Sequence, residues 1–143
     1  MVVIGELDST LNSYAVEENG TLTAVSSIST LPAGFPEGSW CAHVLFSPDG
    51  RFVYGSNRGH DSIAVASFDA HSRALEIVEI VPTGGKEPRN FCLDPTGNWL
   101  LAANQKSDTI TVFSRDGATG RLAPTGAPIA SLTPVCLLFT GEK

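Results

Sequence analysis

Short apolar runs alternate with turn sequences along the whole chain. Residues 44–46 and 52–54 flank the turn Ser47-Pro-Asp-Gly, and two further β-rich runs follow at 63–68 and 75–81. Proline presets φ for a tight turn and glycine accepts a positive φ at its end. No apolar stripe has the 3.6-residue period of a helix. The pattern therefore predicts short antiparallel strands throughout.

The pattern is also repeated. Residues 43–57 align without a gap on residues 90–104, at an offset of 47 residues. The same register continues from Asp61 to Asp108. A third, partial copy precedes them and carries Asp8, and the connection after it is about six residues longer. A period of this size is typical of propellers and solenoids.

Four short antiparallel strands per repeat make one propeller blade. We therefore expect an all-β fold, a β-propeller of about three blades with 12 short antiparallel strands. The expected units are an incomplete blade at 1–31, full blades at 42–82 and 89–130, and a lone closing strand at 135–139. Because propellers need about four to eight blades to close, we expect a partial propeller or one half of an assembled one.

Composition narrows the classes of partner. The chain has 143 residues, nine Lys and Arg, and a formal net charge of -6, so it is a poor candidate for binding a phosphate backbone and we expect no nucleic acid partner. Cys41, Cys92 and Cys136 form no C-x-x-C pair, which favours reduced, buried cysteines. The first residues have no basic region, and no apolar stretch is long enough to span a membrane. We expect a cytoplasmic protein.

Antiparallel alternation decides which loops share a face. The loops between the second and third strands of each blade lie on one face with the starts of the first strands. That face collects the segments 5–8, 57–61 and 104–108, together with 42–43, 87–90 and Pro134. In a closed propeller, loops from several blades converge here on the channel, so this mouth is where we expect a ligand.

Residues that recur in equivalent positions are expected to be structural. Asp8, Asp61 and Asp108 are each followed by Ser or Thr, and we expect them to hydrogen-bond the backbone of their own loops. Asn57 and Asn104 also recur, and a role in the turn at the end of a strand is expected for them.

One mouth position differs in every copy, being Glu6, Arg58 and Gln105 in turn. A repeated fold has no need of an acid, a base and an amide at one geometric position. This set is therefore a candidate for a functional site. The alternative is that these three residues differ because exposed loop positions vary freely.

The starts of the first strands supply further candidates. Arg89 either binds an anion or forms an ion pair with Glu87. His43 and Asn90 share one position, where His43 is either a hydrogen-bonded structural residue or a base. His60 lies in the same mouth and is a candidate by position alone.

Several segments together resemble a known family. They are Ser47-Pro-Asp-Gly-Arg-Phe-Val-Tyr, Ser56-Asn-Arg-Gly-His-Asp-Ser-Ile, Pro82-Thr-Gly-Gly-Lys-Glu-Pro-Arg-Asn-Phe, Asp94-Pro-Thr-Gly-Asn-Trp-Leu-Leu-Ala-Ala-Asn and Pro134-Val-Cys-Leu-Leu-Phe. This combination resembles the seven-bladed lactonase family, of the 6-phosphogluconolactonase and carboxymuconate-cyclising type. Members are more than twice this length, so the resemblance covers their C-terminal portion.

The resemblance implies a carboxylic ester hydrolase that opens an anionic lactone, without a cofactor or metal. Glu6 and Arg58 fit the glutamate and one arginine of the family's suspected site. The chemistry needs a base, for which Glu6 or His43 would serve, and an anchor for the substrate's charge, for which Arg58 and Arg89 would serve. The further substrate-binding candidates are Asn90, Gln105 and His60.

Two other expectations follow from the strand count. A non-catalytic propeller fragment or interaction module is the alternative to a lactonase. We also expect a homo-oligomer, a dimer by strand exchange, in which residues 135–139 of one chain supply the innermost strand that blade 1–31 of the other lacks.

Overall fold

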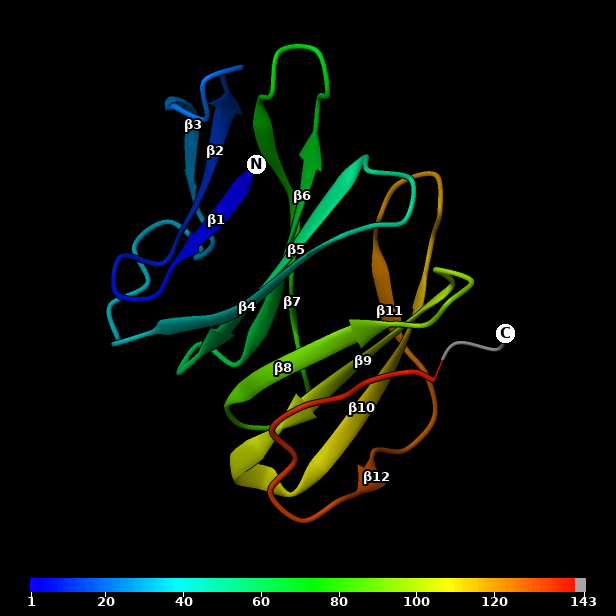
Figure 1. Ribbon diagram of the computed structural model, residues 1–143. Helices are drawn as coiled ribbons and strands as arrows, with labels where there is room; N and C mark the ends of the chain where they lie inside the picture. The colour runs from blue at the N-terminus through cyan, green and yellow to red at the C-terminus, as the bar shows by residue number, and fades with distance from the viewer. Residues whose placement is uncertain (141–143) are drawn as a thin grey trace.

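The protein consists of three twisted antiparallel sheets arranged side by side in chain order (Figure 1). A computed structural model describes residues 1–140. Its twelve strands are β1 (Val2–Gly5), β2 (Thr10–Val16), β3 (Leu22–Ser29), β4 (Trp40–Phe46), β5 (Phe52–Arg58), β6 (Ser62–Phe68), β7 (Leu75–Pro82), β8 (Pro88–Leu93), β9 (Trp99–Asn104), β10 (Thr109–Arg115), β11 (Leu122–Pro124) and β12 (Ile129–Ala130). A 3₁₀ turn, Gln105–Ser107, lies between β9 and β10.

Each sheet is one blade, which confirms the predicted all-β partial propeller. The strand orders are β1-β2-β3, then β4-β5-β6-β7, then β8-β9-β10-β11 with β12 also paired to β10. The fourth strand of the third blade is split, because Gly126 has a φ of +65° and Pro128 has no N–H for the ladder. The structure thus reaches twelve strands by this split rather than by a separate closing strand.

Residues 135–139 do not form the expected strand. The segment runs past β8 without a ladder (Figure 1), and Leu137 N donates one hydrogen bond to Asn90 Oδ1 at 2.8 Å. An innermost strand pairs with the second strand of its own blade, as β4 does with β5 and β8 with β9. Within the described residues no second strand follows this segment, so its backbone has nothing to pair with.

The repeat register in the first blade differs from the sequence alignment by one residue. Ser9, rather than Asp8, shares the left-handed backbone of Asp61 and Asp108, with φ values of 52°, 56° and 53°. Val16 pairs with Leu22 whereas Phe68 pairs with Leu75. The connection between β6 and β7 is therefore one residue longer than the equivalent connection between β2 and β3. A sequence alignment that matches the residues after these connections places Asp8, instead of Ser9, opposite Asp61.

Of the three repeated aspartates, Asp61 binds the backbone of its own loop as expected, whereas Asp8 Oδ1 accepts the hydroxyl of Thr10, and Asp61 and Asp108 also bind backbone at the start of the next unit. Asp61 Oδ1 accepts the N–H of Gly59 at 3.1 Å in its own loop and that of Glu87 at 2.8 Å at the start of the third blade. Asp108 Oδ1 accepts the N–H of Thr133 at 2.8 Å. The carboxylates of Asp61 and Asp108 thus fix the chain where it enters the next unit.

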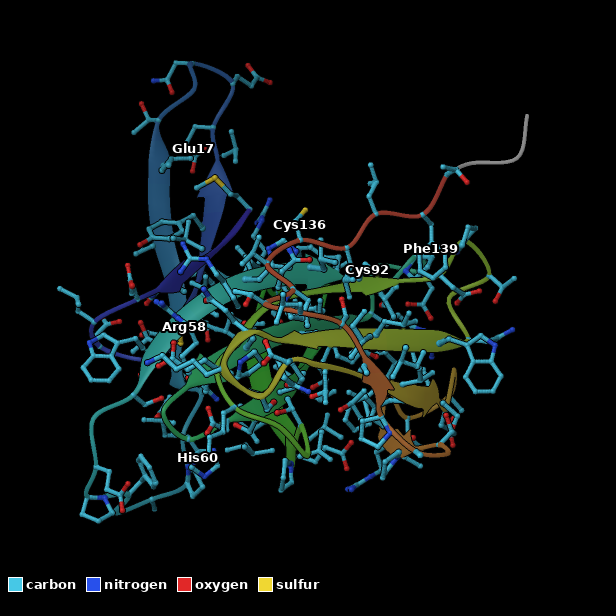
Figure 2. All side chains as sticks on the ribbon, turned by 90° about the horizontal axis from the view of Figure 1, so that it is seen from below. Glu17, Arg58, His60, Cys92, Cys136 and Phe139 are labelled. Atoms are coloured by element: carbon cyan, nitrogen blue, oxygen red, sulfur yellow. The ribbon has the colours of Figure 1, made fainter. Side chains whose placement is uncertain are left out.

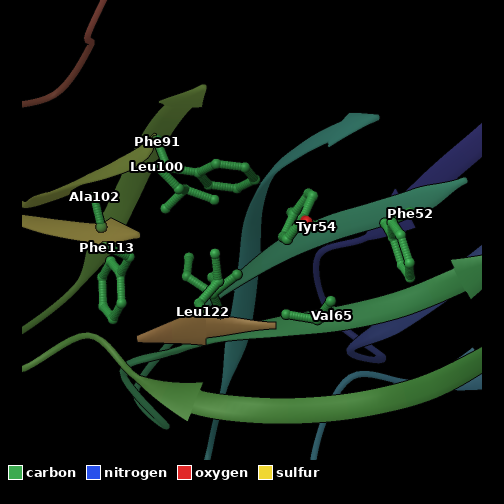
Figure 3. Close-up of a cluster of buried hydrophobic side chains, with 9 residues drawn as sticks. Phe52, Tyr54, Val65, Phe91, Leu100, Ala102, Phe113 and Leu122 are labelled. Carbon is green, nitrogen blue, oxygen red and sulfur yellow. The ribbon is translucent and has the colours of Figure 1, made fainter. Parts of the chain in front are cut away.

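Apolar side chains fill the spaces between blades. One cluster joins the second and third blades (Figure 3), and its members are Phe52, Tyr54, Ile63, Val65, Phe91, Leu100, Ala102, Phe113 and Leu122. A smaller cluster joins the first and second blades, built on Leu11, Val53, Ala66 and Leu75. Burying one such large side chain contributes about 1.5–3 kcal/mol, so these contacts fix the angle between blades.

The three cysteines are free but not equally buried. Cys41 is buried, Cys92 is half-buried and Cys136 is exposed. The expectation of buried cysteines is therefore wrong for Cys136, because the segment that carries it lies on the surface. Among residues 1–140 no helix is long and apolar enough to cross a membrane.

The aspartate clip between blades gives a stability prediction. Asp61→Ala should lower the free energy of unfolding by about 1–2 kcal/mol, because it leaves two loop N–H groups without their acceptor. Asp61→Asn keeps an acceptor oxygen and should retain most of the stability. Urea denaturation checks both variants, and equal stability of Asp61→Ala and the wild type would contradict this role.

A second prediction concerns acid. Hydrogen bonds from the backbone N–H of Ser72 to Asp69, and of Ala118 to Asp116, lower the pKa of both carboxyls below their usual 3.8. A lowered pKa stabilises the fold above the unfolded value, and this contribution is lost as pH falls through the folded value. Stability should therefore decline below about pH 4, and less steeply in the double variant Asp69→Asn, Asp116→Asn, as urea titrations at several pH values would measure.

Candidate functional site

A cleft of about 330 Å³ opens where the three blades meet on the predicted mouth face. Its lining residues come from four strands and the loop after β1: Ile4, Glu6, Cys41, Ala42, Arg58 and Arg89. Three residues predicted from sequence are thus brought together, namely Glu6, Arg58 and Arg89. Ala42 belongs to the segment 42–43 that the repeat places at the mouth, whereas nothing in the sequence marks Ile4 or Cys41 as cleft residues.

Glu6 and Arg58 occupy equivalent positions in successive blades. Arg58 is the last residue of β5, and Glu6 directly follows β1. The carbonyl of Glu6 accepts the N–H of Cys41 at 3.0 Å, which ties the end of β1 to the start of β4. The divergent position of the repeat is therefore placed on both sides of one blade junction.

Arg58 is the most firmly held charge in the cleft. Its side chain is 16% exposed, and Nη2 donates to the Glu6 carboxylate and to the carbonyl of Cys41 at 3.3 Å. The buried Nε has no partner among the described residues. Glu6 is 60% exposed, so the pair joins a fixed guanidinium to a carboxylate that solvent or a ligand can reach.

Arg89 lies exposed on the other side of the cleft. Of the two alternatives for Arg89, the ion pair with Glu87 is not formed: the Glu87 carboxylate binds Lys106 Nζ at 2.6 Å. Among residues 1–140, Arg89 has no ion-pair partner. A guanidinium presents planar N–H donors that match a carboxylate or phosphate. The cleft thus offers an anion one firmly held arginine and one without a counter-charge.

A buried amide network surrounds Asn57, the residue before Arg58. Asn57 is fully buried; its Oδ1 accepts the hydroxyl of Thr30 at 2.7 Å, and its Nδ2 donates to the Thr30 carbonyl at 2.9 Å and to Ser62 Oγ at 3.1 Å. Cys41 Sγ donates to the same Oδ1 at 3.2 Å. Burial raises the pKa of the Cys41 thiol, so this sulfur serves as a hydrogen-bond donor rather than as a nucleophile.

His43 does not line the cleft. A register shift between Cys41 and Val44 interrupts the alternation of β4, and the imidazole packs edge-on against Phe91 with 5.0 Å between ring centroids. Burial lowers the pKa of His43 and so favours the neutral ring. The structure places it in the contact between the second and third blades, which favours the structural alternative.

His60 belongs to a different hollow. Its Nδ1 lies 2.7 Å from Ser62 Oγ, and its ring packs edge-on against Phe35. The hollow that it lines also contains Lys86 and Lys106. Figure 2 shows His60 well apart from Arg58.

Asn90 and Gln105 also lie outside the cleft lining. Asn90 Oδ1 accepts the N–H of Leu137, so its side chain holds the C-terminal segment. Gln105 begins the 3₁₀ turn, and its N–H donates to the carbonyl of Glu87 at 3.0 Å. Within residues 1–140 no group of three or more His, Cys, Asp or Glu side chains could hold a metal ion.

Comparisons with known proteins agree with this architecture. A family model described as "Lactonase, 7-bladed beta-propeller" matches residues 1–139. The 6-phosphogluconolactonase of Bacillus subtilis is 39% identical over 120 residues, which are 84% of this chain and 34% of that protein. Among solved structures, a Lactobacillus plantarum protein superposes with a TM-score of 0.91 at 32% identity, covering 94% of this chain and 40% of that one.

A periplasmic gluconolactonase of Pseudomonas aeruginosa is similar too, with a TM-score of 0.87 and 31% identity over 94% of this chain and 40% of that structure. The chain therefore spans little more than a third of the length of the proteins that it matches.

The unpaired arginine gives a binding prediction. Arg89→Ala should weaken binding of a small phosphate anion by at least about tenfold, because a charged hydrogen-bond donor is lost. Stability should change by less than about 0.5 kcal/mol, since Arg89 is exposed. Isothermal titration calorimetry with inorganic phosphate measures the effect. Arg73→Ala is the matched control, an exposed arginine in a turn on the opposite face, and equal losses in both variants would contradict a site at Arg89.

Proposed function

Because the chain belongs to the lactonase family of seven-bladed β-propellers, we propose that its cleft binds an anionic sugar lactone and takes part in hydrolysing the lactone ester. The observation that carries this proposal is the convergence of Glu6, Arg58 and Arg89 on one cleft. A volume of about 330 Å³ suits a ligand with one sugar ring.

The reaction adds water to the carbonyl carbon of the ring. The C–O bond to the ring oxygen then breaks, and that oxygen leaves as a hydroxyl, which gives the free sugar acid. Glu6 accepts the proton of the attacking water and returns a proton to the departing oxygen. Its exposed carboxylate can reach a water molecule, and Arg58 fixes its orientation.

The two arginines have different roles in this proposal. Negative charge develops on the carbonyl oxygen when water adds, and a fixed donor in a water-poor site stabilises that charge best. Arg58 meets this requirement because it is 16% exposed and held by the Cys41 carbonyl. Arg89, exposed on the other side of the cleft, anchors the phosphate or carboxylate of the substrate.

The substrate class is proposed from the relatives. The Bacillus subtilis relative is named a 6-phosphogluconolactonase, and a phosphorylated six-carbon lactone carries the anion that Arg89 would bind. The chain covers only 34% of that relative. That the chain by itself turns over this substrate is therefore part of the proposal.

A non-catalytic binding segment is the second candidate. The chain covers only 34–40% of the relatives' lengths, and His43, the other candidate base, packs against Phe91 outside the cleft. In that case the cleft would bind the anion without turning over the lactone.

Turnover of 6-phosphogluconolactone above the rate in buffer tests the proposal. Glu6→Gln and Arg58→Ala should each lower kcat/KM by at least about a hundredfold, because they remove a proton acceptor and an oxyanion stabiliser. Glu17→Gln, on the hairpin far from Arg58 (Figure 2), is the matched control and should keep full activity.

The outcomes separate the candidates. Wild-type rates in both cleft variants would overturn the roles of Glu6 and Arg58. A wild-type chain without turnover, but with binding of 6-phosphogluconate that depends on Arg89, would favour the non-catalytic segment.

A further inference from the structure

Two buried serines join the loop of Glu6 to the end of β5. Ser9, in the loop after β1, donates its hydroxyl to the carbonyl of Ser39 at 3.2 Å, where that loop lies beside the start of β4 (Figure 1). Ser39, directly before β4, donates its own hydroxyl to the carbonyl of Arg58 at 3.1 Å. The two serines are 4% and 8% exposed. A chain of two hydrogen bonds thus runs from the loop that carries Glu6 to the backbone of Arg58.

The hydroxyl of Ser39 supplies a link that the next blade makes with its backbone. In the third blade the N–H of Lys106 donates to the carbonyl of Lys86 at 3.0 Å, at the place of Gly59 and Ser39. In the second blade the N–H of Gly59 donates within its own loop instead. The hydrogen bond between the Ser39 side chain and the carbonyl of Arg58 therefore holds the two segments together at this place.

The connection 30–39 also lies against the loop after β5 at two other places. A Cβ at Gly59 would lie 2.4 Å from the carbonyl oxygen of Gly38, so a glycine is needed for the two backbones to come this close. Gly59 has a φ of +99°, which glycine adopts readily. Further along the connection, Phe35 packs edge-on against His60 with 4.7 Å between ring centroids. The connection is thus a fixed support beside the end of β5.

Position 9 differs from its equivalents in the other two blades. Asp61 and Asp108 occupy that position, and the carboxylate of each accepts an N–H at the start of the next unit. At the first junction the group that is bound is the carbonyl of Ser39, which needs a donor. An ionised carboxylate has no proton to donate, whereas the hydroxyl of Ser9 has one. Serine in place of aspartate thus belongs to the link that ends at Arg58.

We propose that Ser9 and Ser39 are positioning residues for Arg58. Their link keeps the end of β5 at a constant distance from the loop of Glu6, so that the guanidinium group stays on the Glu6 carboxylate and on the carbonyl of Cys41. Neither serine lines the cleft, so each acts through Arg58.

The side chain of Arg58 depends on this support. Its hydrogen bonds come from Nη2, and the buried Nε has no partner among the described residues. A displaced backbone would therefore carry the guanidinium group with it. The positioning of Arg58 is independent of turnover, whereas its consequence for catalysis rests on the proposed function.

Proton exchange at Arg58 Nε, measured by NMR spectroscopy, tests the positioning. This N–H is buried without a partner, so it exchanges with water only when the side chain leaves its place. Ser39→Ala should speed the exchange at least about fivefold, because the loss of one such hydrogen bond changes an opening equilibrium by about that factor. Ser39→Thr keeps a hydroxyl and should restore slow exchange. Arg58→Lys identifies the signal by removing it.

Ser114→Ala is the matched control. Ser114 Oγ also donates to a backbone carbonyl, that of Ala123 at 3.3 Å, but it does so between β10 and β11 of the third blade, so its loss should leave the exchange at Arg58 unchanged. Ser9→Ala breaks the other half of the link and should act as Ser39→Ala does, which also decides the matter if circular dichroism shows Ser39→Ala to be unfolded. Unchanged exchange in the folded serine variants, or equal acceleration in Ser114→Ala, would overturn the proposal.

Steady-state kinetics with 6-phosphogluconolactone test the consequence for catalysis. Ser39→Ala should lower kcat about tenfold and leave KM within about twofold, because a displaced Arg58 stabilises the transition state less well while Arg89 still anchors the substrate. Ser39→Thr should recover kcat. A raised KM with unchanged kcat would contradict a role through Arg58. A wild-type chain without turnover would count against the proposed function alone, and the exchange measurement would still decide the positioning.

Discussion

The apolar contact between successive blades is the interaction on which the other features depend. The middle blade uses both faces, with Tyr54 packed towards the third blade and Val53 towards the first. This sandwich makes adjacent residues of β5 inaccessible and fixes the strand from both sides. The blades can turn relative to one another only by breaking these clusters, so the ends of β1, β5 and β8 stay at a constant separation.

The cleft is a consequence of this arrangement. At the end of β5 the packing changes from apolar to polar, and Asn57 joins the first and second blades through Thr30 and Cys41. The next residue, Arg58, is thereby aimed at Glu6 across the junction. An isolated blade would not hold these charges together, because each belongs to a different sheet. The residue that joins the two blades, Asn57, and the charged cleft residue Arg58 are thus neighbours on one strand.

The repeat was enough to predict the blades and three cleft residues, because turns and strands recur in register and the divergent position stands out against them. It could not place His43, since a β-bulge changes the side-chain alternation without a mark in the sequence. Asp8 was misaligned by one residue because of a longer hairpin connection in the second blade. Residues 135–139 have the sequence of a strand but no partner strand within the described chain. A strand needs a second segment to pair with, so the sequence of one segment does not decide whether it forms.

The blade junctions at Arg58 and Arg89 are proposed to form one anion site. A crystal structure of the chain with 6-phosphogluconate tests it most directly. The ligand should lie in the cleft beside Glu6, with its anionic groups on the two guanidinium groups. Ligand bound instead in the hollow of Lys86 and Lys106, with the cleft empty, would contradict it.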